Sequence, residues 1–240
     1  MSHRRAVALM ICVTLMWSIA GIVTRHLESA RGFEVTFWRS LFNALALTLM
    51  LGVLQSPARL WRTLRTGGMP LWVSGACWCV MYTAFMLAIT LTTVANVLVT
   101  MALAPLFTAL ASRLALGHRL ALRTWAAIVM AGAGIAWMYG AELSAAEPRH
   151  LLGTAVALCV PIAAAVNWTL LQHLYRRPDA GRPPDMLAPV LLGALLSAAV
   201  ALPLAWPFGA SAHDLQLLGL LGVVQLAIPC LLSVRVARVL

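Results

Sequence analysis

The chain has 240 residues, of which 62% are hydrophobic and 10% charged, and its mean hydropathy is +0.91. This is too little polar surface to cover a soluble globular protein, so the composition indicates a membrane protein. A formal net charge of +10 would suggest nucleic-acid binding in a soluble protein. Here the arginines are spread over short loops, which favours attraction to a lipid bilayer and no nucleic-acid partner.

A membrane-spanning helix needs about 20 mostly apolar residues. In chain order, the segments that meet this requirement are 6–27, 33–55, 69–91, 94–116, 121–140, 151–175, 187–208 and 215–237. The first follows a short basic stretch, as in a signal peptide, but its apolar run is long and no convincing cleavage site follows, so we expect it to be retained. We therefore predict an all-α fold, a polytopic membrane helix bundle of about eight transmembrane helices.

The arginines orient the predicted helices. With a cytoplasmic N-terminus, that side holds Arg4, Arg5, Arg59, Arg62, Arg65, Arg113, Arg119, Arg123, Arg176, Arg177, Arg182, Arg235 and Arg238. The opposite side then holds Arg25, Arg31 and Arg149. Because cytoplasmic loops of membrane proteins are enriched in basic residues, we predict a multi-pass protein of the cell (inner) membrane whose N-terminus is cytoplasmic.

Short matches indicate an internal repeat. "RHL" at 25–27 resembles "QHL" at 172–174, and Gly75 matches Gly222, both at an offset of 147 residues (172 − 25 and 222 − 75). The predicted domains are a first repeat of five helices at 1–140, an external loop at 141–150, and an incomplete second repeat of three helices at 151–240. Because five is odd, the second repeat begins on the opposite side of the membrane, which is typical of secondary transporters. Two helices of the second repeat are missing, so we expect either a fragment or an eight-helix form.

The sequence offers little for catalysis or for cofactors. All cysteines lie inside predicted spans: Cys12, Cys77, Cys79, Cys159 and Cys230. We predict that they pack as small apolar groups and that the chain binds no metal. No phosphate-binding glycine loop with lysine, no H-E-x-x-H and no G-x-S-x-G motif occurs, so we expect no cofactor and no enzyme activity.

Three stretches carry a family resemblance. They are "LMWSIAGIVTRHL" with "FEVTFWRSLFNAL", then "ANVLVTMALAPLFTALASRLALGHRL", and finally "LGVVQLAIPCLLSVRVARV". Their distinctive residues are Trp17, Gly21, Arg39, Pro105, Gly222, Gln225, Pro229, Ala237 and Arg238. Over essentially its whole length the chain resembles the EamA-like family of the drug/metabolite transporter (DMT) superfamily. It departs from that family in having Gly117–His118 where Gly-Glu is common, and in lacking the last two helices.

The resemblance implies a two-repeat permease with both termini cytoplasmic. Its expected function is the export of small metabolites such as amino acids or drugs, by alternating access through a cavity between the repeats. Two alternatives stay open. In the first, the chain is a non-transporting truncated remnant, or an assembly partner that completes its bundle with another chain, for example in a homo-oligomer. In the second, which has less support, it is an intramembrane enzyme.

Arg39 is a charge inside an apolar span, about 7.5 Å along the helix axis from Glu34 at 1.5 Å per residue. It can snorkel to the outer interface, form a structural ion pair, or face the interior and bind an anionic substrate group with its guanidinium. Asn43 lies four residues on and so on the same helix face. Together, Glu34, Arg39 and Asn43 favour a polar vestibule that contacts substrate.

Further polar or aromatic residues at depth are candidates for the substrate site. Trp17 with Ser18, and Asn167 with Trp168, are mid-span in the first helix of each predicted repeat, and Tyr82, Asn96 and Gln225 are additional lining candidates. Packing between helices is the competing interpretation for each of them. For gating or coupling the candidates are Glu34 and His26 at the outer mouth, and Pro105 and Pro229, where proline frees a helix carbonyl.

Overall fold

A computed structural model describes residues 3–117, 122–143, 148–175 and 186–236. All regular elements in these ranges are helices, joined mostly by short connections. The chain divides into two compact units: the first is Met1–Cys79 with Asp185–Leu240, and the second is Val80–Pro184. The helix α5 (Gly68–Leu91) contributes its first half to the first unit and its second half to the second.

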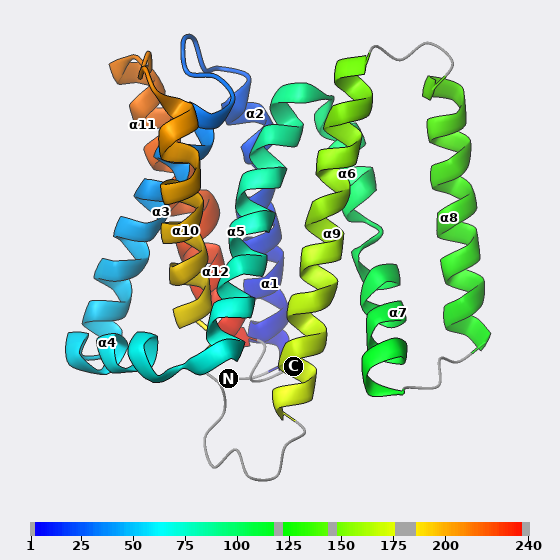
Figure 1. Cartoon of the computed structure of the whole chain (residues 1–240), viewed down its shortest axis with the longest axis horizontal. Helices are drawn as coiled ribbons and strands as arrows, with labels where there is room; N and C mark the ends of the chain where they lie inside the picture. The colour runs from blue at the N-terminus through cyan, green and yellow to red at the C-terminus, as the bar shows by residue number, and fades with distance from the viewer. Residues whose placement is uncertain (1–2, 118–121, 144–147, 176–185, 237–240) are drawn as a thin grey trace. The chain divides into compact units, whose positions relative to one another are not determined.

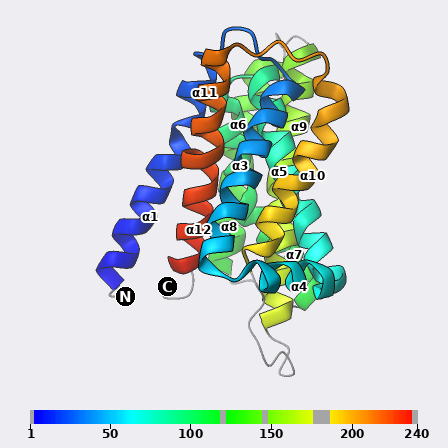
Figure 2. The ribbon, with the colours of Figure 1, turned by 90° about the vertical axis from the view of Figure 1, so that its left-hand side faces the viewer.

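The first unit brings early and late parts of the chain together. Besides the start of α5 it contains α1 (His3–Ser18), α2 (Ala20–Thr24), α3 (Phe33–Leu54), α4 (Pro57–Thr66), α10 (Ala188–Ala205), α11 (Ala212–Leu220), the π-helix η1 (Leu221–Ala227) and α12 (Ile228–Val236). The helix α3 packs along α10 and against η1, and α1 packs against α12 (Figures 1 and 2). Helices from the two predicted repeats therefore share one core.

The second unit contains the rest of α5 with α6 (Val94–Met101), α7 (Ala104–Leu116), α8 (Leu122–Leu143) and α9 (Pro148–Tyr175). The helix α9 packs against α6 and α7. Its apolar contact with this unit includes Ala88, Val97 and Ala157, which are fully buried. Small side chains at such contacts let neighbouring helices approach closely.

Seven helical segments of the described residues are long and apolar enough to cross a membrane. They are His3–Thr24, Phe33–Leu54, Gly68–Leu91, Val94–Ala115, Pro148–Leu174, Ala188–Ala205 and Ala212–Val234. Each coincides, within a few residues, with a span predicted from the sequence, and α8 occupies the remaining predicted span at 121–140. The prediction of an all-α, polytopic membrane helix fold is thus confirmed.

Three predicted spans are less regular than a single α-helix. The first is interrupted at Ile19, between α1 and α2, and the fourth at Ala102 and Leu103, between α6 and α7. Pro105 lies in the first turn of α7, where a missing backbone N–H does no harm. The last span passes through the π-helix η1 before Pro229 in α12.

Candidate functional site

One face of α3 is polar and buried. Arg39 is 1% exposed, and Ser40 and Asn43 are 0% exposed. Because Arg39 and Asn43 are four residues apart, they lie one turn apart on the same helix face. The burial of Arg39 is not that of a snorkelling side chain, whose charged end reaches the interface. Of the interpretations that the sequence left open, those with an interior arginine agree with the structure.

Two neighbouring helices cover this face of α3. From α10, Ser197 is fully buried and its Oγ lies 2.9 Å from the Oγ of Ser40. From η1, Gly222 approaches so closely that an added Cβ would lie 2.8 Å from both the carbonyl oxygen of Arg39 and the backbone nitrogen of Asn43. A glycine is required there, because only a residue without a side chain lets the two backbones come this near.

Two buried amides near this helix contact have unused hydrogen-bonding atoms. Neither the Nδ2 nor the Oδ1 of Asn43 has a hydrogen-bond partner among the described residues, and the same holds for the Oε1 of Gln225 in η1, which is 3% exposed. A buried polar group left without a partner costs about 1 to 3 kcal/mol. Such groups call for an explanation, such as a ligand or a water molecule that supplies the missing bonds.

Pro229 favours the π-helical stretch that carries Gln225. Pro229 has no backbone N–H, so it cannot give the carbonyl of Gln225 the bond that an α-helix would make four residues on. The bonding shifts instead to the wider spacing, as in the N–H of Ile228, which donates to the carbonyl of Val223. Short π-helical segments inside α-helices occur frequently at functional sites.

Sequence analysis missed the burial of Asp214, in the first turn of α11. Its Oδ1 accepts from the N–H of Glu28 (2.8 Å), and its Oδ2 accepts from the N–H groups of Ser29 (3.0 Å) and Ala30 (2.9 Å). Asp214 also forms a capping box with Ser211, whose Oγ accepts from the N–H of Asp214 at 3.1 Å. The spacing Ser211-x-x-Asp214 before an apolar run is the sequence signal that could have identified this helix start.

Asp214 of α11 binds the loop before α3, and Glu34 of α3, predicted as a gating residue, binds the loop before α11. It lies in the first turn of α3, is 7% exposed, and its Oε1 accepts from the N–H groups of Gly209 (2.9 Å) and Ala210 (2.8 Å) in the loop before α11. His26 is exposed, and its Nδ1 lies 2.9 Å from the carbonyl oxygen of Ile22. These bonds give Glu34 and His26 separate backbone partners at the same end of the first unit.

The candidates of the second unit form a different group. Asn96 is buried, and its Nδ2 donates to the Oγ1 of Thr92 (3.0 Å) and the Oγ1 of Thr154 (2.7 Å), which joins α6 to α9. Tyr82 and Asn167 are also buried, whereas Trp168 is 42% exposed. These bonds are compatible with the packing interpretation of Asn96, and its place in the substrate site stays a prediction.

Trp17 and Ser18 lie at the end of α1, in the first unit. Trp17 is 37% exposed, and the hydroxyl of Ser18 donates to the carbonyl of Leu15 within its own helix at 2.8 Å. Their predicted pairing with Asn167 and Trp168 of the second unit stays a prediction. Arg39 and Asn43 lie on α3 and Gln225 lies on η1, and these two helices are in direct contact.

No group of three or more His, Cys, Asp or Glu residues that could hold a metal ion occurs among the described residues. The cysteines that sequence analysis assigned to packing all lie among the described residues and form no disulfide there, and Cys77 and Cys230 are buried. The buried face of α3 and its neighbours present a guanidinium, hydroxyls and amides, which bind and orient polar groups.

Comparisons with known proteins identify the family. The model of the EamA-like transporter family matches residues 4–140. A solved structure titled "Crystal structure of protein" aligns with 97% of this chain and 78% of its own, with a TM-score of 0.64 and 20% sequence identity, which shows a shared fold. The comparison with curated proteins finds no match. The family match covers more than half of the chain, which therefore belongs to the EamA-like transporter family, within the DMT superfamily, and is a multi-pass membrane protein.

Proposed function

We propose that this chain is an inner-membrane permease that exports small polar metabolites by alternating access, with its N-terminus in the cytoplasm. A small-molecule substrate and a bilayer location follow from the family. The observation that carries the proposal further is the buried polar face of α3, where the amide of Asn43 has no partner among the described residues. The face meets η1, so a site there would lie between elements of the two predicted repeats, as in other transporters built from inverted repeats.

The polar groups on this face favour one chemical class of substrate. The guanidinium of Arg39 favours an anionic group such as a carboxylate. Asn43 offers both a donor and an acceptor, and the Oε1 of Gln225 offers an acceptor. A small molecule with a carboxylate and a nearby amine or hydroxyl would satisfy all three side chains. Amino acids meet this description, and we place them first among the substrates to test.

Alternating access needs places where helices bend or separate. The interruption before Pro105 and the π-helical turn before Pro229 are such places, because their backbone hydrogen bonding departs from a regular α-helix. The contacts of Glu34 and Asp214 are at the N-terminal end of α3, and the arginines of α4 follow its other end. In the proposed orientation, the end with Glu34 is the outer end. We propose that this end opens when substrate leaves.

The test is transport by the purified chain in proteoliposomes. Vesicles are loaded with radiolabelled amino acids, or in parallel with cationic dyes, and efflux is measured for the native chain and for Arg39→Ala. Arg25→Ala is the matched control, because Arg25 is an exposed arginine of the same unit. We expect efflux of a carboxylate-bearing substrate that Arg39→Ala reduces at least tenfold and the control leaves unchanged. Absence of transport over the whole panel would favour the alternative of a non-transporting chain.

A further inference from the structure

The short helix α4 lies between two membrane spans and was not predicted from the sequence. It begins after Ser56, whose Oγ accepts from the N–H of Arg59, with Pro57 in its first turn. It runs crosswise to α3, at the end of the first unit where the chain starts (Figures 1 and 2). With 10 residues it is too short to cross a bilayer, and its amphipathic sequence suits the membrane surface.

The apolar side of α4 is fixed to the bundle. Leu60 is 7% exposed, and Leu64 packs against the cluster formed by Leu71 of α5 with Ala188 and Leu192 of α10. These two leucines are four residues apart and so occupy one face. The opposite face of α4 is consequently held at a defined position and turned away from the core.

That opposite face carries three exposed arginines, Arg59, Arg62 and Arg65. At 3.6 residues per turn, a spacing of three places them within an arc of about 120°. The chain has no aspartate or glutamate between Glu34 and Glu142. Among the described residues, no carboxylate pairs with these three side chains. Within the part of the chain that the structure describes, the face is therefore a concentrated positive charge that no carboxylate neutralises.

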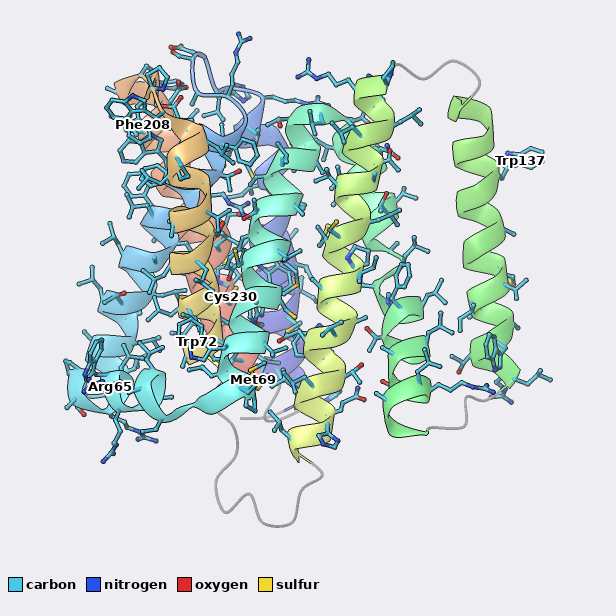
Figure 3. The ribbon with its side chains drawn as sticks, viewed as in Figure 1. Arg65, Met69, Trp72, Trp137, Phe208 and Cys230 are labelled. Atoms are coloured by element: carbon cyan, nitrogen blue, oxygen red, sulfur yellow. The ribbon has the colours of Figure 1, made fainter. Side chains whose placement is uncertain are left out.

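Exposed apolar side chains flank this charge. Trp61 is 60% exposed, and the guanidinium carbon of Arg65 lies 5.4 Å from the centre of its ring. Met69 and Trp72 at the start of α5 are 75% and 52% exposed, and Figure 3 shows them at the same end as Arg65. A soluble polyanion would leave these side chains in water. A lipid offers an anionic headgroup to the arginines and acyl chains to the apolar groups, and tryptophan is enriched at this level of the membrane.

We propose that α4 is a binding site for anionic phospholipid. The lipid phosphate contacts Arg59, Arg62 and Arg65, and the upper part of the acyl chains lies along Trp61, Met69 and Trp72. Charge complementarity selects anionic over zwitterionic headgroups, because each basic residue near an anionic surface contributes about 1 kcal/mol. This site is separate from the buried face of α3 and holds whether or not that face binds a transported substrate.

The test measures lipid binding by the purified full chain in a neutral detergent. Phosphatidylglycerol and phosphatidylcholine are titrated separately, and bound lipid is counted by native mass spectrometry. The variant Arg59→Gln/Arg62→Gln/Arg65→Gln is compared with Arg25→Gln/Arg31→Gln, which removes exposed arginines at the other end of the same unit. We expect the native chain to prefer phosphatidylglycerol, the triple variant to lose about fivefold in this preference per arginine removed, and the control pair to keep it.

A charge-preserving variant separates binding from folding. Arg59→Lys/Arg62→Lys/Arg65→Lys keeps all three cations, so it should keep most of the preference for phosphatidylglycerol. The proposal is wrong if the triple glutamine variant retains the native preference, or if the control pair loses as much of it. It is also wrong if the lysine and glutamine variants lose the preference equally, because charge would then not be the cause.

Discussion

At the scale of single residues, two carboxylates at the same end of the first unit each bind the loop that precedes the other's helix. Asp214 at the start of α11 binds the backbone of the loop before α3, and Glu34 at the start of α3 binds the backbone of the loop before α11. Hydrogen bonds to a charged acceptor are stronger than those between neutral groups. Each acid also lies in the first turn of its helix, where negative charge is favoured by the helix dipole.

This geometry predicts that Asp214→Ala destabilises the protein. The N–H groups of Glu28, Ser29 and Ala30 would lose their acceptor, and that of Ala30 is buried, so we expect a loss of about 2 to 3 kcal/mol in the free energy of unfolding. Thermal unfolding in detergent measures it. The matched control is Glu28→Ala, which removes an exposed side chain and keeps the backbone N–H. Equal stability of the two variants would show that the bonds of Asp214 do not support the fold.

The candidate site was predictable at some residues and hidden at others. Arg39 and Asn43 are conspicuous because a polar side chain inside an apolar span needs a reason to be there. Asp214 was overlooked because it lies near the beginning of a span and reads as a boundary residue. Its burial depends on a loop about 185 positions earlier in the chain, and such a contact is a property of the tertiary structure.

At the scale of helices, the contact between α3 and η1 is decided by one glycine. A Cβ on Gly222 would lie 2.6 Å from the Cβ of Phe42 and 2.8 Å from two backbone atoms of α3. Backbone cannot move aside as a flexible side chain can, so the helices would have to separate. Overpacking of this kind costs about 1 to 3 kcal/mol.

We therefore predict that Gly222→Ala lowers the melting temperature in detergent and reduces transport. Gly219→Ala is the control: it lies one turn earlier in the same span, and the nearest atoms to its added Cβ are ring carbons of Phe42 at 4.0 Å. It should leave stability unchanged or raise it slightly, because alanine favours a helix more than glycine does. A tolerated Gly222→Ala, or equal damage at both positions, would argue against close backbone contact.

Sequence patterns located the helices well and their irregularities poorly. Each span needs a long apolar run to cross a bilayer, and such runs are visible in the sequence, for example at 33–55 and 69–91. The π-helix η1 carries no comparable signal. The surface helix α4 is too short for a span, and sequence analysis missed it although Ser56, Pro57 and its amphipathic pattern mark a helix. Pro229 marks a disturbed helix, but whether it produces a kink or a π-turn depends on the neighbours that pack against it.

At the scale of the molecule, the two predicted repeats are interleaved within the first unit. Gly75 of the third span packs against Leu192 in the seventh, and Gly222 of the eighth span packs against Phe42 in the second. These glycines are the pair that sequence analysis matched at an offset of 147 (222 − 75), and each contacts the second span of the other repeat. This supports the inverted repeat, which remains our prediction for the domain organisation.

The proposed orientation predicts which loops are accessible from outside the cell. A cysteine introduced as Ser29→Cys, in the loop after α2, should react in intact cells with a maleimide that cannot cross membranes. One introduced as Arg62→Cys, in α4, should react only after the cells are permeabilised. The unmodified chain controls for labelling of its own cysteines, of which Cys12 and Cys159 are exposed. Labelling in the reverse pattern would place the N-terminus outside.

The most direct test of a substrate site at Asn43 is a single variant, Asn43→Leu, in which both stability and transport are measured. Removing a buried amide whose atoms have no partner among the described residues should raise the free energy of unfolding by about 1 to 3 kcal/mol. If Asn43 binds substrate, the same variant should lose transport in proteoliposomes. A more stable but inactive protein is the predicted result. A destabilised protein, or one that transports at the native rate, would contradict the assignment of Asn43 to the substrate site.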